Sequence, residues 1–354
     1  HLKNAFCLGV GGEATLGPHV GDLDDLETLR SFKESVARME RFLRVRPELL
    51  AHDLHPAYLS TRYALERSRR EGIPAVAVQH HHAHAVAAMT EHALAGPVLA
   101  LTWDGTGLGA DGTAWGGELL LARADGFDRL ATFRPLPLAG GDRAVREPWR
   151  LALVALDQAF PDRPPDEAFP ALAAVPGGDR EVVRRMVAAG LNAPPAHGAG
   201  RLFDVVAALA LGRGDSRYEG QLAIALDAAA DEGDPGCYPF AIDTAASPWQ
   251  LDWRPLVRAV AGDVLAGVPA GAISMRFHRT LAAAAAELLR MAEAAHGRLP
   301  VVATGGVFQN ARLAALLAGE VEGRFEVYLP SRVPPGDGGI ALGQAVVASA
   351  VAGS

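Results

Sequence analysis

The residues best suited to chemistry are four histidines within five positions, His80, His81, His82 and His84, in a chain that has only 12. On a helix, side chains four positions apart lie on one face, so His80 and His84 could bind a single ion. Neutral imidazole is a common ligand of zinc and iron. The spacing therefore predicts a metal site, with a solvated polar helix start as the alternative interpretation.

Two histidines seldom complete a metal site, so we expect a carboxylate ligand from elsewhere in the chain. The best candidates are Asp104 and Asp337, because each is followed by closely spaced glycines. Glycine lets the backbone approach a phosphate closely, and an aspartate beside it can hold a metal ion or a water molecule. We expect residues 104–112 to contact a phosphate or a metal, and a hairpin turn in the same segment is compatible with that role.

The composition is that of an ordinary globular protein, with 49% hydrophobic and 21% charged residues, and 354 residues suit two lobes. A net charge of −8 counts against nucleic acid as the main partner. Cys7 and Cys237 lie far apart and form no disulfide framework, which suits a reducing cytoplasm. No apolar run is long enough to span a membrane. The abrupt start at His1 suggests a segment of a longer protein.

Strand-like and helix-like patterns alternate along the chain, which predicts an α/β fold with a largely parallel, covered sheet. In such sheets, ligands usually bind at the carboxyl ends of the strands, where the histidine cluster and Asp104 stand. Paired strands are expected over 115–122 with 129–133, and within 238–252. The other predicted strands are 4–10, 48–53, 75–78, 98–103, 300–303 and 325–329, and the predicted helices include 26–43, 58–70, 80–94, 201–209, 273–296 and 340–351.

Three further segments carry groups suited to a nucleoside. Asp204, and Glu219 in a stretch from residue 215 that we expect to open a helix, could accept ribose hydroxyls, although caps and ion pairs are commoner uses of such residues. Gly305 and Gly306 bring backbone close to something flat, such as an adenine. Asn310 could either cap the following helix or bind the ligand.

Several motifs, in one order along nearly the whole chain, resemble the C-terminal part of HypF, the carbamoyltransferase of nickel–iron hydrogenase maturation. They are the segments 2–7, 53–56, 78–84, 103–107, 146–150, 200–204, 218–221, 305–310 and 337–344, which read LKNAFC, DLHP, VQHHHAH, WDGTG, REPWR, GRLFD, YEGQ, GVFQN after Gly305, and DGGIALGQ.

The resemblance implies the two-lobed α/β fold of actin, the heat-shock chaperone ATPases and the sugar kinases, with a nucleotide cleft between the lobes. We expect lobes at 1–96 and 97–354, the second with helical insertions, and allow the last helix, 340–351, to pack back on the first lobe. In the family this domain follows others, among them a YrdC-like domain, that are not in this sequence.

The resemblance also implies an activity: the domain binds carbamoyl-adenylate, made from carbamoyl phosphate and ATP, and transfers the carbamoyl group to the C-terminal cysteine of HypE for cyanide-ligand synthesis. A metal ion, iron or zinc, would be held by His80, His84 and Asp337, and magnesium could accompany the nucleotide. By this resemblance, the catalytic residues would be His80, His84, Asp104 and Asp337, and the phosphate would lie near Asp104, Gly105, Thr106 and Gly107. The ribose would lie near Asp204, Glu219 and Gly220, and the adenine near Gly305, Gly306 and Asn310.

Three alternatives share parts of this pattern. A relative that carbamoylates a small-molecule hydroxyl would use the same fold, metal and intermediate. A TsaD-type tRNA-modifying enzyme is disfavoured by the net charge and by the lack of an acidic residue between His80 and His84. An actin-like nucleotide-binding protein without transfer chemistry would not need the histidine pair.

The sequence departs from the family pattern at Gly336, where the family usually has asparagine. Within the histidine cluster, His81 and His82 are expected to contact substrate or to support the ligands.

Overall fold

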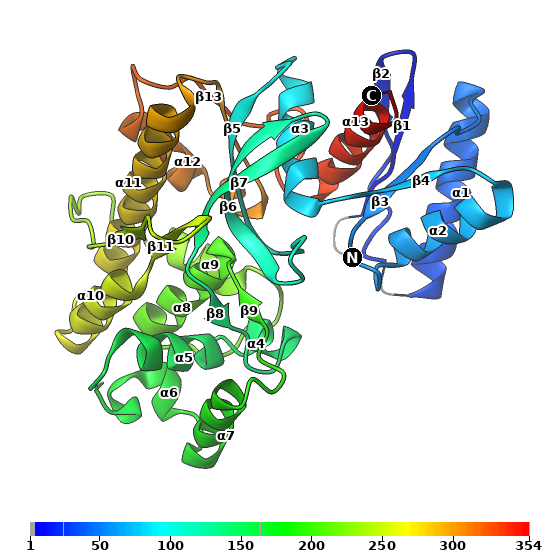
Figure 1. Ribbon diagram of the computed structural model, residues 1–354. Coiled ribbons are helices and arrows are strands. Elements are labelled where there is room, and N and C mark those ends of the chain that lie inside the picture. Colours follow the sequence, from blue (N-terminus) through cyan, green and yellow to red (C-terminus); the bar gives the residue numbers. More distant parts are fainter. Residues whose placement is uncertain (1–3, 24, 163, 354) are drawn as a thin grey trace.

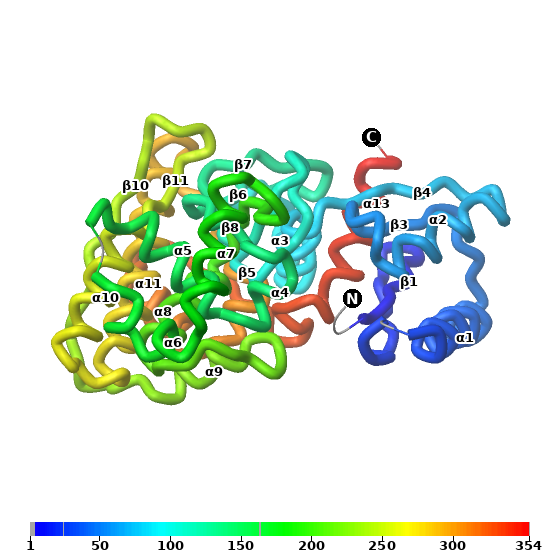
Figure 2. The backbone as a smooth tube through the Cα atoms, turned by 90° about the horizontal axis from the view of Figure 1, so that it is seen from below, coloured from blue at the N-terminus to red at the C-terminus, as the bar shows by residue number. Residues whose placement is uncertain are grey.

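The protein has two lobes, as expected, in a computed structural model that describes residues 4–23, 25–162 and 164–353. Figure 1 shows a small lobe at the N-terminus (blue) beside a larger lobe built on a curved sheet. The last helix (red) lies between them in both views (Figures 1 and 2). Leu2 and Lys3, which open the first family motif, lie outside the described residues. No helix of the described chain combines the length and apolar character needed to cross a membrane.

The small lobe contains two short sheets and two helices. Strands β1 (Cys7–Val10) and β2 (Glu13–Leu16) form an antiparallel hairpin around Gly11 and Gly12, whose positive φ angles suit glycine. Helix α1 (Leu26–Leu43) begins where the Asp25 side chain accepts the Thr28 N–H. Helix α2 (Leu59–Glu71) connects the parallel pair β3 (Leu50–Asp53) and β4 (Ala75–Val78).

The larger lobe is organised by a nine-stranded mixed sheet in the order β10-β11-β7-β6-β5-β12-β13, in which β9 also pairs with β6 and β8 pairs with β9. The expectation of a largely parallel sheet is wrong here. Short turns join β5 to β6 and β6 to β7, and such turns can connect only antiparallel neighbours. The strands are β5 (Val98–Leu108), β6 (Ala114–Arg123), β7 (Gly126–Phe133), β8 (Leu136–Pro137), β9 (Pro195–Ala196), β10 (Ala241–Asp243), β11 (Trp249–Asp252), β12 (Val301–Thr304) and β13 (Val327–Tyr328).

Both hairpin predictions are confirmed, since β6 pairs with β7 and β10 with β11, each antiparallel. Two boundaries differ from expectation. Strand β5 continues through Asp104 to Leu108, because its glycine-rich end still pairs with β6 after a register shift. Residues 215–220 do not open a helix; α9 starts only at Gln221, after Gly220 adopts a left-handed conformation.

Alternation along the strands buries both faces of this sheet. Leu99 and Leu101 face the large core shared with the helices of the second lobe, whereas Val98 and Ala100 face a second core with helix α3 (His80–Glu91). The remaining helices are α4 (Asp142–Arg146), α5 (Trp149–Ala159), η1 (Asp166–Ala168), α6 (Pro170–Ala173), α7 (Gly177–Ala188), α8 (Ala199–Leu211), α9 (Gln221–Ala228), α10 (Arg254–Leu265), α11 (Ala270–His296), η2 (Gly306–Gln309), α12 (Ala311–Glu320), η3 (Asp337–Gly339) and α13 (Ile340–Gly353).

Helix α13 packs closely on α3 and also contacts strands β1 to β4 of the small lobe. The contact with α3 is tightest at Gly343, where an added Cβ would overlap the carbonyl oxygen of Ala83. That oxygen belongs to helix backbone and cannot move aside without disturbing α3. The two helices therefore approach closely because residue 343 has no side chain.

We expect Gly343→Ala to destabilise the protein by about 1–3 kcal/mol, the usual cost of overpacking a close contact. Urea unfolding would measure the loss. Gly319→Ala is the matched control, because Gly319 lies in α12 with nothing within 4 Å of an added Cβ. Alanine there should be neutral or slightly stabilising. Equal effects of the two substitutions would contradict the close-packing explanation.

Candidate metal and nucleotide site

Four side chains predicted from the sequence meet at one point: His80, His84, Asp104 and Asp337. One ligand atom from each lies within 4.8 Å of all the others, the only such group of metal-type ligands that we identify among the described residues. His80 Nε2 and His84 Nε2 lie 3.4 and 3.6 Å from Asp104 Oδ2, and both lie 3.8 Å from Asp337 Oδ1. Side chains from α3, β5 and η3 thus converge on one position.

The histidines face this position because α3 begins directly after β4. Gln79 caps the helix by accepting the His82 N–H, so His80 is the first helical residue and His84 follows one turn later. Both imidazoles are almost fully buried, with side-chain exposures of 3% and 1%. The expected helical presentation of this pair is confirmed.

Asp53 orients His80 from behind and was not among the predicted site residues. Its Oδ2 lies 2.9 Å from His80 Nδ1, so the ring donates Nδ1–H and turns Nε2 toward the two other carboxylates. Outer carboxylates of this kind fix the tautomer of a metal-binding histidine. A sequence signal existed: Asp53 ends strand β3, which pairs in parallel with β4 just before His80.

His84 supplies the observation that best tests whether a cation fits. Its Nε2 is buried and has no hydrogen-bond partner, although it faces Asp104 and Asp337. A buried nitrogen left unpaired carries a free-energy cost, which coordination would remove. Two imidazoles and two carboxylates suit zinc or iron. The residues present therefore fit a divalent metal ion.

Asp104 is held by backbone N–H groups of β5 and of the η2 turn that follows the neighbouring strand β12. Its Oδ1 accepts the N–H groups of Gly105 at 2.8 Å and of Gly306 at 3.2 Å, which leaves Oδ2 for the histidines. A Cβ on Gly306 would stand 2.6 Å from that Oδ1, and one on Gly107 would stand 2.6 Å from the His80 ring. The glycines at these positions are required by close approach.

The charges of the four groups are strongly coupled. Burial disfavours ionised Asp104, but the hydrogen bond to His80 and the nearby His80 and His84 imidazoles outweigh burial and hold the pKa of Asp104 well below its usual value. Burial likewise opposes a charged His80, yet Asp104 and Asp53 raise its pKa well above 6.5. Burial and the nearby Asp104 charge raise the pKa of Asp337. Two carboxylates in so small a space favour a cation or protons between them.

The predicted phosphate and ribose residues gather around Gly105. A Cβ on Gly105 would stand 3.0 Å from the Arg201 guanidinium and 3.3 Å from the Glu219 carboxylate. Arg201 also pairs with buried Asp204 at 3.0 Å, and burial raises the pKa of Asp204 despite that partner. The structure thus places Asp204 in an ion pair near the glycine-rich end of β5, a use that the sequence left open.

The predicted adenine residues lie on the η2 turn at the end of β12. Asn310 caps α12 by accepting the Leu313 N–H at 2.9 Å, one of its two predicted uses. Its amide nitrogen lies 2.8 Å from His278 Nε2, while His278 Nδ1 donates to the Ser274 carbonyl at 2.8 Å. His278 was not predicted, and its neutral form orients the Asn310 side chain.

Of the other predicted nucleotide residues, Gly220 lies in the loop just before α9, and Thr106 is exposed near the end of β5.

His81 and His82 do not join the ligand group. His82 Nε2 donates to the Arg123 carbonyl at 2.7 Å, and its ring packs near Phe127. His81 is fully buried beside Trp115, with Nδ1 3.2 Å from the Gln79 amide nitrogen. His82 therefore ties the start of α3 to the end of β6 through the Arg123 carbonyl.

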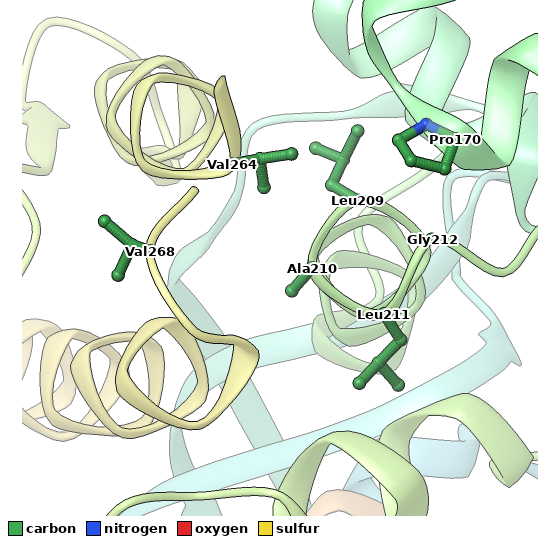
Figure 3. Close-up of a pocket in the computed structure, with 7 residues that line it drawn as sticks. All are labelled: Pro170, Leu209, Ala210, Leu211, Gly212, Val264 and Val268. Atoms are coloured by element: carbon green, nitrogen blue, oxygen red, sulfur yellow. The ribbon is translucent and has the colours of Figure 1, made fainter. Parts of the chain in front are cut away.

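Two cavities lie away from this cluster. One of about 270 Å³ is formed by α8, α6 and the turn after α10, and Figure 3 shows that Leu209, Leu211, Val264 and Val268 line it. No titratable side chain lines it, so it offers no chemistry. A larger one, about 1600 Å³, lies between the β1–β2 hairpin, α1, α2 and α13. Neither is lined by any of the four ligand residues.

Comparison with known proteins finds two family models. Residues 1–91 match the "HypF Kae1-like domain", and residues 100–344 match the "Carbamoyltransferase, Kae1-like Domain, second subdomain". Residues 92–99 lie between the two matches.

Curated relatives agree. A carbamoyltransferase HypF of Rhodobacter capsulatus is 42% identical over 99% of this chain and 46% of its own length. A "Carbamoyltransferase HypF homolog" of Cupriavidus necator is 40% identical over 98% of this chain and 89% of its own length. The chain thus spans about half the length of most of the curated relatives it matches.

Among solved structures, full-length HypF in a phosphate- and nucleotide-bound form superposes over all of this chain and 46% of its own, with a TM-score of 0.93 and 33% identity. HypF of T. kodakarensis gives a TM-score of 0.87 at 28% identity, over 98% of this chain and 46% of its own.

We expect Asp53→Asn to weaken metal binding by ~10–100-fold, as loss of an outer carboxylate typically does. The amide can accept only with its oxygen, so its NH₂ group must face either the His80 Nδ1–H or the His55 N–H that Asp53 now satisfies. Competition titration with Zn²⁺ would give the Kd. Asp125→Asn, at an exposed ion pair, is the control. An unchanged Kd for Asp53→Asn would show that Asp53 does not support the ligand.

Proposed function

Because the chain belongs to the HypF carbamoyltransferase family, we propose that it binds carbamoyl-adenylate and transfers its carbamoyl group to the C-terminal cysteine of HypE. Three findings support the family's activity here: both family models, relatives named carbamoyltransferase at about 40% identity, and the fold of solved HypF. The upstream step that forms carbamoyl-adenylate would belong to the part of the relatives that this chain does not span.

One observation carries the proposal: His80, His84, Asp104 and Asp337 present converging ligand atoms, and the buried His84 nitrogen has no other partner. We propose these four as the catalytic group, with both histidines and Asp337 as metal ligands and Asp104 as a further one. When bound, a divalent iron or zinc ion supplies positive charge and Lewis acidity toward a phosphate or carbonyl oxygen.

The surrounding backbone suits a nucleotide. Gly105, Thr106 and Gly107 directly follow Asp104, so we assign them to binding the phosphate. Magnesium would bind together with the nucleotide. Arg201, Asp204, Glu219 and Gly220 lie next in space or sequence and would approach the ribose, while Gly305, Gly306 and Asn310 would border the adenine. The phosphate and nucleotide bound by a HypF of 0.93 TM-score support a nucleotide site in this fold.

The proposed reaction is an acyl transfer. The cysteine thiolate of HypE attacks the carbamoyl carbon, the bond from that carbon to the phosphate oxygen breaks, and AMP leaves with the electron pair. The product is a thiocarbamate on HypE. Because the nucleophile belongs to the partner, neither Cys7 nor Cys237 is needed. His80 and His84 are buried, and a site closed around them would keep water from the carbamoyl carbonyl, which otherwise hydrolyses.

The test is transfer of radiolabel from freshly prepared carbamoyl-adenylate to HypE. We expect His80→Ala and His84→Ala to lose metal and to slow transfer by more than ~100-fold, beyond the usual effect of outer residues. His296→Ala, at the exposed end of α11, is the control and should retain both. Far-UV circular dichroism would confirm that the variants fold.

Three results would contradict the proposal. Labelling of an aminoglycoside-like alcohol, with none of HypE, would assign the chain to small-molecule carbamoylation instead. Full-rate transfer by a variant that binds no metal would remove the metal from the reaction. Nucleotide binding without transfer to either acceptor would favour the actin-like alternative.

A further inference from the structure

Glu91, the last residue of α3, binds a segment that is 240 residues away in the sequence. Its Oε1 accepts the Ser331 N–H at 2.8 Å, the Ser331 hydroxyl at 2.7 Å and the Arg332 N–H at 2.8 Å. Its Oε2 accepts the Val333 N–H at 3.1 Å. Four donors, three of them consecutive backbone N–H groups, thus converge on one carboxylate.

The contact holds Glu91 in its charged form, although the residue is only partly buried. The hydrogen bonds outweigh the effect of burial and lower the pKa of Glu91 to about 2, so the carboxylate stays charged at any physiological pH. Hydrogen bonds to an ionised acceptor are shorter and stronger than neutral ones. His92, the next residue, adds a contact from its Nε2 to the Leu329 carbonyl at 2.9 Å. The end of α3 therefore holds the backbone of 329–333.

The held segment leads directly into Asp337. Pro334 and Pro335 follow this segment and restrict the backbone between the residues held by Glu91 and Asp337. The Pro335 carbonyl accepts the Gly305 N–H at 2.8 Å and the Thr304 hydroxyl at 3.2 Å. Gly339 then passes so close to the Pro334 carbonyl that no Cβ would fit there. Little freedom remains between Val333 and Asp337.

The same helix carries His80 and His84 near its other end. We infer that Glu91 is a positioning residue of the metal site: by fixing residues 331–333 to the end of α3, it sets Asp337 at its distance from the two histidines. This inference rests on the metal site of the proposed function. It makes α3 responsible for three ligands, two carried directly and one through Glu91.

A double-mutant cycle tests whether Glu91 acts through Asp337. The Kd for Zn²⁺ would be measured in the wild type, Glu91→Gln, Asp337→Asn and the double variant. Glutamine keeps the shape but turns an NH₂ group toward the backbone donors, so we expect ~10–100-fold weaker binding. The double variant should bind no more weakly than Asp337→Asn alone, because residues that act as one unit are not additive.

Controls separate positioning from general stability. Glu293→Gln weakens an ion pair with Arg324 that involves none of the ligand residues, and it should leave the Kd unchanged. Ser331→Ala removes one of the four donors and should weaken Zn²⁺ binding by a smaller factor, which keeps the test open if Glu91→Gln unfolds. Thermal melts would establish folding for each variant.

Either of two outcomes overturns the inference while leaving the metal site intact: wild-type affinity in both Glu91→Gln and Ser331→Ala, or additive losses in the double variant. A wild-type chain that binds no Zn²⁺ and no Fe²⁺ would overturn the metal site itself, and the positioning role with it.

Discussion

The burial of helix α3 is the constraint on which the site depends. The helix lies against the sheet on one side and against α13 on the other, and all residues from His80 to Met89 are buried. A helix with no exposed face must fill its polar positions with partners. His80 and His84 therefore face Asp53, Asp104 and Asp337, His82 meets a backbone carbonyl, and His81 contacts the Gln79 side chain.

Electrostatics then decides what the cluster can hold. Asp104 and Asp337 face each other across two imidazoles, in a region where like charges are poorly screened. The two imidazoles hold the pKa of Asp104 low, whereas burial and the nearby Asp104 charge raise the pKa of Asp337. A divalent cation would satisfy both carboxylates and both nitrogens together, as the proposed metal site requires.

Close backbone approach is the second physical requirement. Gly306 lets η2, the turn after β12, donate an N–H to Asp104, Gly107 leaves room for the His80 ring, and Gly343 lets α13 lie on α3. Each glycine removes a side chain where two elements must touch. The helix that bears the two histidines is thus fixed by close contacts with its neighbours.

The sequence by itself determined the features that depend on local spacing. The four-residue interval of His80 and His84 fixed their common face, the periodicity located α1, α3 and α13, and the motifs identified the family. The motifs also brought Asp104 and Asp337 to the histidine pair. Only the tertiary structure decided which further groups hold them in place. Asp53 behind His80, Gly306 on Asp104 and Glu91 on residues 331–333 join positions 27 to 242 residues apart. Such pairings follow from strand order and helix packing, as does the mixed sheet, and the position of Asp53 at the end of a predicted strand is the one hint that the sequence offers.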